Sequence, residues 1–374
     1  MTILHVLEPF ATGVTTAVIS ITRELSDFEH IVIHGSRNWT ESTEKMKQRF
    51  PAGVSFVEWK HAAREISLSG DWKALKELKA ILKPYAVRSK RESLPIVVHL
   101  HSSKAGFLGR FACRLLGIKA VIYTPHCGAF LRTDISSLKR NLYYFFEWLG
   151  SGFGGRVVGC GPSEGEVYRK LGKNTVYVSN GVEIKKEQVT GDKKKNKREF
   201  ISFTGLASFQ KDPSMWANIA AASTGLVREA GFSFYWIGDG PEAMILKQDY
   251  INLTGWKSAE EVEGLLEKTA IYFSAAAWEG LPYGILEAMS SGCALLLRNV
   301  SGHRELVIPG ENGQLFSTVE EAVELLKSML KDRNRLEVMG KRSREIAERN
   351  YSLKQMGEGY RRIYSSYYQE VKIG

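Results

Sequence analysis

Two glutamates, Glu279 and Glu287, flank the loop Gly280-Leu281-Pro282-Tyr283-Gly284, in which glycine and proline alternate with apolar residues. An apolar run ends just before Glu279, and a helical pattern begins at Gly284 with Glu287 expected inside its first turn. The N–H groups and positive dipole end of a helix N-terminus bind phosphate, and a carboxylate there can accept hydrogen bonds from ribose hydroxyls. The alternative is structural, because an acidic side chain also stabilises a first helical turn. The pattern predicts a binding site for the phosphates of a nucleotide, formed by Gly280, Tyr283, Gly284, Ile285, Leu286 and Glu287.

A cation stands ahead of a second expected helix. The segment from Gly205 to Pro213 reads Gly-Leu-Ala-Ser-Phe-Gln-Lys-Asp-Pro, with Lys211 two residues before a proline suited to a first helical position. Such a lysine can neutralise a diphosphate leaving group while the helix amides hold its oxygens. Gly205 and Lys211 are therefore predicted to bind the same phosphates.

The elements that must position these residues follow from the pattern of the whole chain. In the first half, strands are expected near 3–7, 30–33, 55–58, 96–100, 120–123, 157–160 and 175–178, and helices near 15–25, 72–82, 104–116, 135–149 and 164–171. Several strands are continuous apolar runs, as a parallel sheet covered on both faces requires. The first half is predicted to be a doubly wound α/β domain.

A second α/β series follows. Strands are expected near 200–204, 232–237, 251–253, 271–273 and 294–297, helices start near Pro213, Ser258 and Gly284, and the pattern is helical from Val319 onward. We predict an N-terminal domain at 1–184 completed by a C-terminal helix at 355–374, a basic linker at 185–198 and a C-terminal domain at 199–354. Two Rossmann-like domains of this kind place the carboxyl ends of their strands around a shared interdomain cleft.

Composition and charge restrict the class of protein. The 374 residues are 44% hydrophobic and 25% charged, which excludes disordered and collagen-like chains. Residues 1–180 hold 25 Lys and Arg against 15 Asp and Glu, so the whole net charge of +10 resides there. This asymmetry favours an anionic partner such as a membrane leaflet, a phosphorylated substrate or nucleic acid, although a basic surface also serves solubility alone. The basic run at 193–198 has no interleaved aromatic residues and is interpreted as linker, so no nucleic-acid partner is predicted.

Taken together, these segments resemble the retaining nucleotide-sugar glycosyltransferases of the GT-B fold, specifically family 4. The resemblance covers nearly the whole chain, and its motifs are weak singly but specific in combination. They are Thr12-Gly13-Val14, Thr124-Pro125-His126, Asn180-Gly181-Val182, Gly205 to Lys211, Gly238-Asp239-Gly240-Pro241, Thr254-Gly255-Trp256, Glu279 to Glu287 and Gly310-Glu311-Asn312-Gly313.

The resemblance implies roles for further residues. His126, just past an expected strand end, would contact the donor sugar, and Glu279 would face the reacting sugar; a lone histidine is otherwise a satisfied surface or core residue. Gly13 would let the backbone approach the phosphate or sugar, in a loop or a tight turn with positive φ. Trp256 would line the base pocket or pack as a loop aromatic.

One position departs from the family pattern. The family pairs its lysine with an arginine directly after the glycine, and this chain has Leu206 there. Losing one of two phosphate clamps removes about 3 kcal/mol of transition-state stabilisation. The best substitute in the sequence is Lys104, at the expected start of a cleft-facing helix; its alternative is a solvated helix-start residue.

No metal site and no cofactor are predicted, because the sequence has no Asp-x-Asp motif and no His, Cys or carboxylate cluster at metal spacing. The implied activity is a metal-independent retaining glycosyl transfer from a nucleotide diphosphate sugar to an acceptor hydroxyl, in bacterial cell-surface polysaccharide or glycolipid assembly. The alternatives are a catalytically silent homologue that binds a nucleotide sugar or a partner enzyme, and a sugar-nucleotide epimerase.

The acceptor and the location are expectations of the same kind. A sugar or lipid-linked sugar acceptor suits the basic first half, and the aromatic segment 143–148 beside Arg132, Lys139 and Arg140 would either meet an anionic membrane surface or pack as a core helix. The chain lacks a signal-peptide pattern, a membrane-spanning apolar run and paired cysteines. We therefore expect a cytoplasmic protein, peripheral on the inner face of the plasma membrane.

Overall fold

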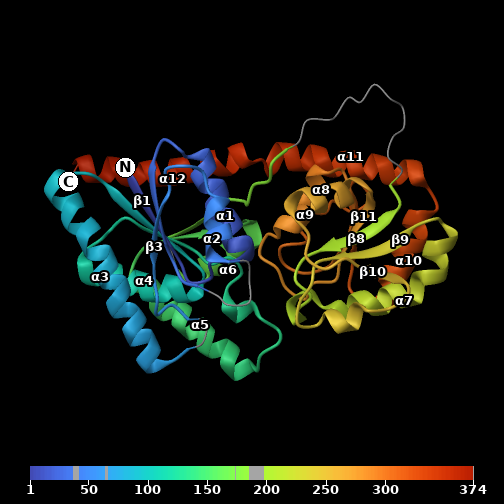
Figure 1. Cartoon of the computed structure of the whole chain (residues 1–374), viewed down its shortest axis with the longest axis horizontal. Coiled ribbons are helices and arrows are strands. Elements are labelled where there is room, and N and C mark those ends of the chain that lie inside the picture. The colour runs from blue at the N-terminus through green and yellow to red at the C-terminus, as the bar shows by residue number, and fades with distance from the viewer. Residues whose placement is uncertain (37–41, 64–65, 173, 185–197, 374) are drawn as a thin grey trace. The chain divides into compact units, whose positions relative to one another are not determined.

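The computed structural model describes residues 1–36, 42–63, 66–172, 174–184 and 198–373, and the chain divides into two compact units (Figure 1). The first unit comprises Met1–Gly181 and Leu353–Gly374, and the second comprises Val182–Ser352. Of the expected linker at 185–198, only Arg198 lies among the described residues.

The first unit is built on a seven-stranded parallel sheet in the order β3-β2-β1-β4-β5-β6-β7. Its strands are β1 (Thr2–Leu7), β2 (Glu29–His34), β3 (Ser55–Glu58), β4 (Ile96–His101), β5 (Val121–Thr124), β6 (Arg156–Gly159) and β7 (Thr175–Tyr177). Its helices are α1 (Thr12–Glu24), α2 (Thr43–Gln48), α3 (Leu68–Glu92), α4 (Ser103–Leu116), α5 (Ser137–Ser151), α6 (Pro162–Arg169) and α12 (Leu353–Ile373), with the short turn η1 (Ala129–Leu131).

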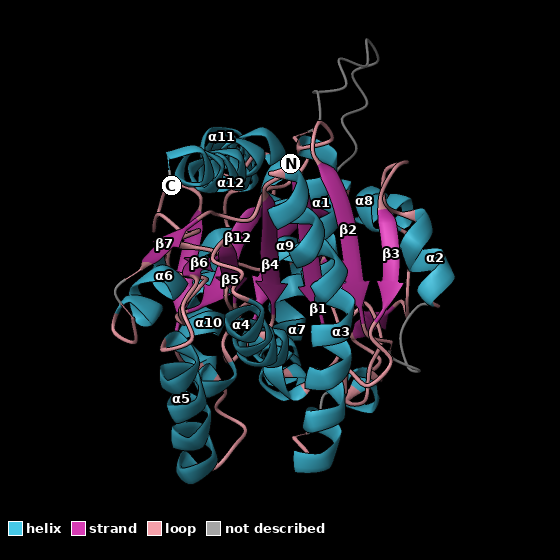
Figure 2. Ribbon diagram, turned by 90° about the vertical axis from the view of Figure 1, so that its left-hand side faces the viewer, coloured by secondary structure: helices cyan, strands magenta, loops and turns pink. Residues whose placement is uncertain are grey.

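Alternate residues of each central strand enter two different cores. Leu4 and Val6 of β1 belong to the core that α3 and α4 cover, whereas Ile3 belongs to the core that Tyr360 and Tyr364 of α12 help to fill. Strand β1 lies between β2 and β4 (Figure 2). Because side chains of a strand alternate between faces, a sheet with helices on both sides must bury nearly every residue, and all six residues of β1 are buried. Helix α12 thus covers the sheet of the first unit although it ends the chain.

The second unit has a six-stranded parallel sheet in the order β10-β9-β8-β11-β12-β13. Its strands are β8 (Phe200–Thr204), β9 (Ser233–Ile237), β10 (Ile251–Leu253), β11 (Thr269–Ser274), β12 (Ala294–Arg298) and β13 (Gly313–Phe316). Its helices are α7 (Pro213–Glu229), α8 (Ala259–Glu267), α9 (Tyr283–Ser290), α10 (Val319–Leu330) and α11 (Arg333–Asn350), with the turns η2 (Phe209–Lys211) and η3 (Ala243–Leu246).

The predicted fold class, two doubly wound α/β domains, is confirmed, while several element boundaries differ. Helix α2 and strand β13 were not expected, because both are short. Helix α3 runs from Leu68 to Glu92 rather than 72–82, since Pro84 lies on its exposed side and the helix continues past it. In the described part of the chain, no helix combines the length and the apolar character needed to cross a bilayer.

Candidate active site

Lys211 and Glu279 form an ion pair at the carboxyl edge of the second sheet. The Nζ of Lys211 donates to Oε1 of Glu279, and the side chains are 20% and 7% exposed. Gln210 lies beside them, and its side-chain amide donates to the main-chain oxygen of Trp278 at 3.1 Å. The structure therefore brings together two predicted site residues that are 68 positions apart in the sequence.

The turn between β8 and α7 holds Lys211 in place. Lys211 ends the one-turn helix η2, and Asp212 follows with a φ of 49°, in the left-handed region. The side chain of Asp212 accepts a hydrogen bond from the N–H of Met215 at 3.0 Å, which caps α7, and Pro213 fills its first position. Left-handed backbone at a non-glycine residue costs about 1–3 kcal/mol, and such strain concentrates at functional sites.

Arg298 is a second cation near this pair, and sequence reasoning missed it. It ends β12, and its Nη1 donates to Oδ2 of Asp212 at 2.9 Å and to the oxygen of Ala275 at 3.2 Å. Burial, together with the charges of Lys211 and Arg298, lowers the pKa of His303 to about 3. Both cations therefore act on one buried imidazole. The only signal in the sequence was a lone arginine at the end of an apolar strand.

Two predicted glycines are required by close packing. A Cβ on Gly284 would lie 2.5 Å from Oγ1 of Thr204 and 2.7 Å from the hydroxyl of Tyr272, so the start of α9 can approach the end of β8 only without a side chain. Gly205 has a φ of 149°, its N–H donates to Ile237 at 3.0 Å, and its oxygen accepts from the indole of Trp236. These glycines bring the loops after β8 and β11 close together.

Helix α9 differs from its prediction in one respect. It begins at Tyr283 after Pro282, so Glu287 is its fifth residue and not part of its first turn. The N–H groups of Ile285 and Leu286 both donate to the oxygen of Pro282, at 3.2 and 3.3 Å, and their side chains are buried. Ile285 and Leu286 are thus engaged within the turn, and a contact of Glu287 with ribose remains a prediction.

The remaining predicted residues of the second unit lie at the same edge. Trp256 follows β10 and is 65% exposed, Gly280 is buried directly after Glu279, and Tyr283 opens α9. Gly255, just before Trp256, bridges to Gly238 after β9, so the loops that follow β9 and β10 touch. The exposed indole of Trp256 is available to a ligand, in contrast to the packed loop aromatic that was the alternative.

His126 lies at the carboxyl edge of the first sheet. It follows β5, is partly buried, and its Nε2 lies 3.0 Å from Nδ1 of His101. Desolvation by the surrounding chain lowers the pKa of His126 to about 4. Among the described residues, positive φ at a non-glycine position occurs at Ser93, Ser102, His126, Cys127 and Asp212. Apart from Ser93, they all follow a strand end at a carboxyl edge.

Two predictions for the first unit differ from the structure. Gly13 is the second residue of α1, exposed and without positive φ, and so it lies in neither a loop nor a tight turn. Lys104 donates from Nζ to Oδ1 of Asp71 at 2.6 Å, and its side chain is 12% exposed. The structure thus joins Lys104 to the start of α3, which corrects the alternative of a solvated residue. A role for Gly13 or Lys104 in substrate binding remains a prediction.

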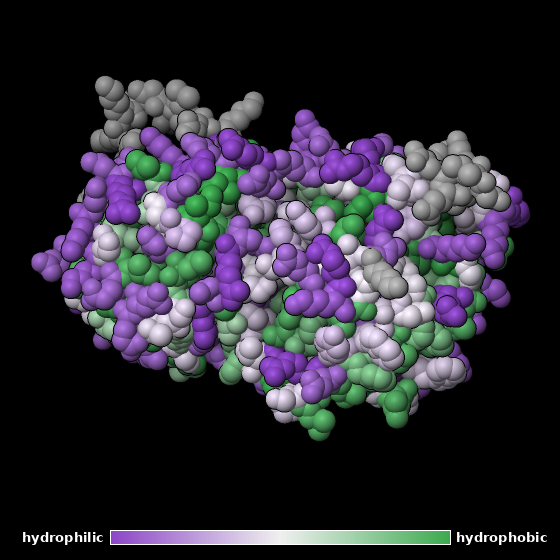
Figure 3. Space-filling view, turned by 180° about the vertical axis from the view of Figure 1, so that it is seen from behind, coloured by the Kyte–Doolittle hydropathy of each residue, from purple (hydrophilic) through white to green (hydrophobic). Residues whose placement is uncertain are grey.

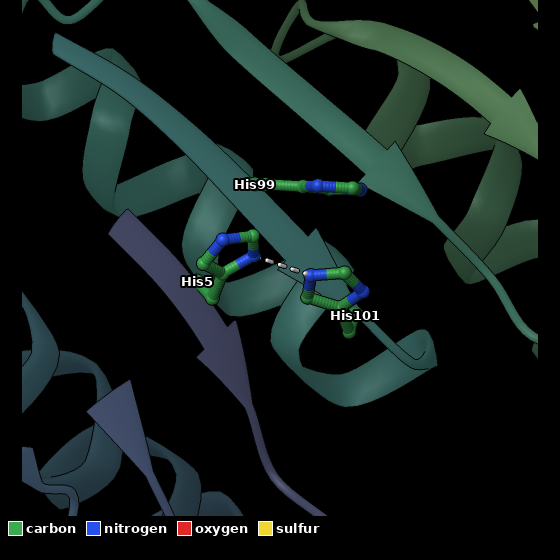
Figure 4. Close-up of side chains that lie close together, drawn as sticks. All are labelled: His5, His99 and His101. Carbon is green, nitrogen blue, oxygen red and sulfur yellow. Dashed lines mark hydrogen bonds between the residues drawn. The ribbon is translucent and has the colours of Figure 1, made fainter. Parts of the chain in front are cut away.

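A cluster of buried histidines was not anticipated by the sequence analysis. Ring nitrogens of His5, His99 and His101 approach within 4.8 Å of one another (Figure 4). Both nitrogens of His99 already face hydroxyl groups, of Tyr364 at 2.7 Å and Thr124 at 2.8 Å. A metal ion would have to displace these hydrogen bonds, so the residues fit a hydrogen-bonded network better than a metal centre.

Comparison with solved structures shows which fold the two units have. HepE of Anabaena, solved in complex with UDP and glucose, superimposes with a TM-score of 0.75 over 98% of this chain and 100% of its own, at 14% identity. The lipopolysaccharide outer core galactosyltransferase WaaB superimposes with a TM-score of 0.69 over the same shares, at 18% identity. The two α/β units thus have the GT-B fold of glycosyltransferases.

Sequence comparison identifies the family. The model described as "Glycosyl transferase 4-like domain" matches residues 12–181, and that described as "Glycosyl transferases group 1" matches residues 242–346. A UDP-Gal:alpha-D-GlcNAc-diphosphoundecaprenol alpha-1,3-galactosyltransferase of Escherichia coli is 30% identical over 65% of this chain and 66% of its own length. A 41.2 kDa protein in the cps region of Klebsiella pneumoniae is 24% identical over 98% and 100%. The chain belongs to the group 1 glycosyltransferases, and it is an enzyme of that class.

Proposed function

We propose that this glycosyltransferase moves a sugar from a nucleotide diphosphate sugar to an acceptor hydroxyl, with retention and without a metal ion. The second unit, which we assign to 199–354, would bind the donor, and the first, assigned to 1–184 with 355–374, would bind the acceptor. The observation that carries the proposal is the Lys211–Glu279 pair at the carboxyl edge of a parallel sheet, where such sheets bind ligands.

In the free protein, Glu279 neutralises Lys211. A diphosphate would compete with that carboxylate for the ammonium, and Glu279, released next to the sugar, would stabilise the positive charge that develops at the anomeric carbon. Because this pair is largely shielded from water, both interactions are stronger than at the surface. The pair therefore joins leaving-group and sugar stabilisation at one place.

Arg298 supplies the cation that Leu206 does not. It contacts Asp212, the residue directly after Lys211, and shares the electrostatic environment of His303 with Lys211. We assign Arg298 the role of the second phosphate clamp in place of Lys104, because Arg298 lies in the same unit as Lys211, whereas Lys104 lies in the first unit. Leu206 in place of the family's arginine is the main reason to consider a catalytically silent protein, and a second clamp at Arg298 removes that reason.

A donor-hydrolysis assay tests the proposal, with UDP-sugars as first donors because the relatives' names specify UDP. We expect Lys211→Ala to lower turnover by ~100-fold or more and Glu287→Ala to weaken donor binding by ~10-fold. Lys257→Ala, a lysine in an exposed pair with Glu261, is the control and should be unchanged. Wild-type rates in both site variants would overturn the assignment.

Product analysis separates the alternatives. A new glycoside supports transfer, an isomerised donor would mean an epimerase, and unchanged donor in the presence of bound UDP would mean a silent homologue. The anomeric configuration of the glycoside tests retention, and full activity in EDTA tests independence of a metal.

We further propose that α5 brings a peripheral, cytoplasmic protein to a lipid-linked acceptor on an anionic membrane of a cell-surface polysaccharide or glycolipid pathway. The E. coli relative is named for a diphosphoundecaprenol-linked acceptor. Apolar surface is visible along the lower edge in Figure 3, and α5 exposes large apolar side chains beside the exposed cations Lys139 and Arg140. They are Leu138, Leu142, Tyr144, Phe145, Trp148 and Leu149.

Sedimentation with anionic liposomes tests this surface. Binding should be strong at low salt, fall steeply as salt rises, and weaken in Lys139→Glu/Arg140→Glu. Lys327→Glu, an exposed lysine of α10, is the control. Absence of binding at low salt would remove the membrane from the proposal and leave the transfer reaction untouched.

A further inference from the structure

Four histidines of the first unit form a continuous hydrogen-bonded chain that ends at His126. Nδ1 of His101 lies 3.0 Å from Nε2 of His126, and Nε2 of His101 lies 3.2 Å from Nδ1 of His5. Nε2 of His5 lies 3.1 Å from Nδ1 of His30, whose Nε2 lies 2.8 Å from the oxygen of Leu25. The contact between His5 and His101 is drawn in Figure 4.

The rings also stack along this chain. Their centroids are 5.3 Å apart for His101 and His126, 5.4 Å for His5 and His101, and 5.3 Å for His5 and His30. His5, His30 and His101 are at most 3% exposed, whereas His126 is only partly buried. The chain thus runs from the interior of the sheet to its carboxyl edge.

Burial keeps every ring of the chain neutral near pH 7. Desolvation is the main cause that lowers the pKa of His5, His30, His101 and His126, and neighbouring histidines lower those of His5 and His101 further. A neutral imidazole carries one proton, so it donates from one nitrogen and accepts at the other.

The oxygen of Leu25 fixes the direction of the chain. A carbonyl oxygen can only accept, so Nε2 of His30 must carry the proton and Nδ1 of His30 must accept. Nε2 of His5 therefore donates to His30, Nε2 of His101 donates to His5, and Nε2 of His126 donates to His101. Nδ1 of His126 is left with a lone pair, and the described residues offer no hydrogen bond to it.

We propose that His5, His30 and His101 are positioning residues that hold His126 in the Nε2–H tautomer, so that its Nδ1 accepts a hydrogen bond from a hydroxyl group of a sugar substrate. An unprotonated phosphate oxygen can only accept a hydrogen bond, and so can this nitrogen, so phosphate is excluded as its partner. The sugar identity of the hydroxyl donor rests on the proposed function, whereas the tautomer does not.

Two further polar groups support a hydroxyl-binding site at this edge. Oγ1 of Thr15, in the first turn of α1, and Oγ of Ser102, just before α4, are buried and have no hydrogen-bond partner among the described residues. Neither group carries a charge, and Ser102 follows β4, the strand that pairs with β5 ahead of His126. A hydroxyl without a partner can donate to or accept from a hydroxyl group of a sugar.

Long-range ¹⁵N correlation spectra of ring-labelled histidine in the free wild-type protein test the tautomer directly. We expect the His126 signals, assigned through their loss in His126→Asn, to show protonated Nε2 and bare Nδ1 at pH 7. An Nδ1–H form, an even mixture, or displacement of the His5, His99 and His101 signals by one equivalent of Zn²⁺ would overturn the proposal. No donor is needed, so this outcome is independent of the proposed function.

A matched pair of variants tests the positioning role. In His101→Gln the amide can still accept from His126 and donate to His5, whereas His101→Leu can do neither. We expect the leucine variant to lose the tautomer bias and to lower kcat ~10-fold with UDP affinity unchanged, and the glutamine variant to retain both within ~3-fold. Equal tautomer spectra in the two folded variants would contradict the role of His101, and normal spectra without any transfer would contradict only the proposed function.

Discussion

The carboxyl edges of the two sheets differ in kind although the sheets share one architecture. At the second, charged side chains gather, with Lys211 and Arg298 against Glu279 and Asp212. At the first, Lys104 pairs with Asp71, but His126 leads into a chain of neutral imidazoles. The net charge is distributed in the opposite way, since residues 1–180 carry the whole excess of basic residues. The difference teaches that the charge of a domain describes its surface, whereas the chemistry of its site depends on a few partly buried groups.

The largest expected consequence of the comparison is selective acid unfolding of the first unit. Burial lowers the pKa of six of its histidines: His5, His30, His34, His99, His101 and His126. Among the described residues of the second unit, burial lowers the pKa of one histidine, His303. The unfolded chain binds these protons below about pH 6.5, whereas folded His126 does so only near pH 4. Stability is therefore full above pH 6.5 and is lost as the pH falls below it, by up to ~1.4 kcal/mol per pH unit for each histidine.

Amide hydrogen exchange at pH 7 and pH 5, corrected for intrinsic rates, measures this difference. Strands β1, β4 and β5 should lose protection at pH 5 while β8 and β11 keep most of theirs. Glu164, whose pKa burial raises, works in the opposite direction but is a single group. Equal loss of protection in both sheets would contradict the comparison.

A second prediction separates the two edges by kinetics. His126→Gln should lower turnover by ~30-fold, because the hydroxyl acceptor is displaced, while UDP affinity changes less than ~2-fold. His61→Gln is the matched control, since His61 belongs to the same unit but is exposed and paired with Glu77. Isothermal titration with UDP and steady-state kinetics give both quantities. A large loss of UDP affinity in His126→Gln would place the diphosphate at the first edge instead.

The sequence predicted the architecture well because apolar strand runs and helix-start signals are local. Lys211 and Glu279 were also found, since each sits at a glycine- or proline-marked strand end. Arg298 and the histidine chain were missed for a different reason. Their meaning comes from strand order: β1 lies between β2 and β4, which places His5 beside both His30 and His101. No spacing within a single segment carries that information.

A third prediction concerns the charged edge. Arg298→Ala should weaken UDP binding by ~10-fold, because the diphosphate loses one of two cations. Arg304→Ala is the control. Arg304 is an exposed arginine six residues after Arg298, and its side chain donates a hydrogen bond to Asn299. Melting temperatures should be compared, since Arg298 also contacts Asp212. Unchanged UDP affinity in a folded Arg298→Ala protein would return the role of the second clamp to another cation.

The smallest expected effect concerns Trp256, an uncharged residue of the second unit that can be compared with a tryptophan of the first unit. Its indole is 65% exposed, so Trp256→Ala should leave the free energy of unfolding within ~0.5 kcal/mol of wild type. If the indole contacts the base, affinity for UDP should fall by ~5-fold, while affinity for inorganic diphosphate should not change. Trp72→Ala is the control, since Trp72 is a 56% exposed tryptophan of the first unit, and it should alter neither affinity. Equal losses for UDP and diphosphate would mean that Trp256 supports the phosphate loop. No loss for either ligand would remove Trp256 from the donor site, and Lys211 and Arg298 would then be the residues that distinguish this edge from the histidine-lined edge of the first sheet.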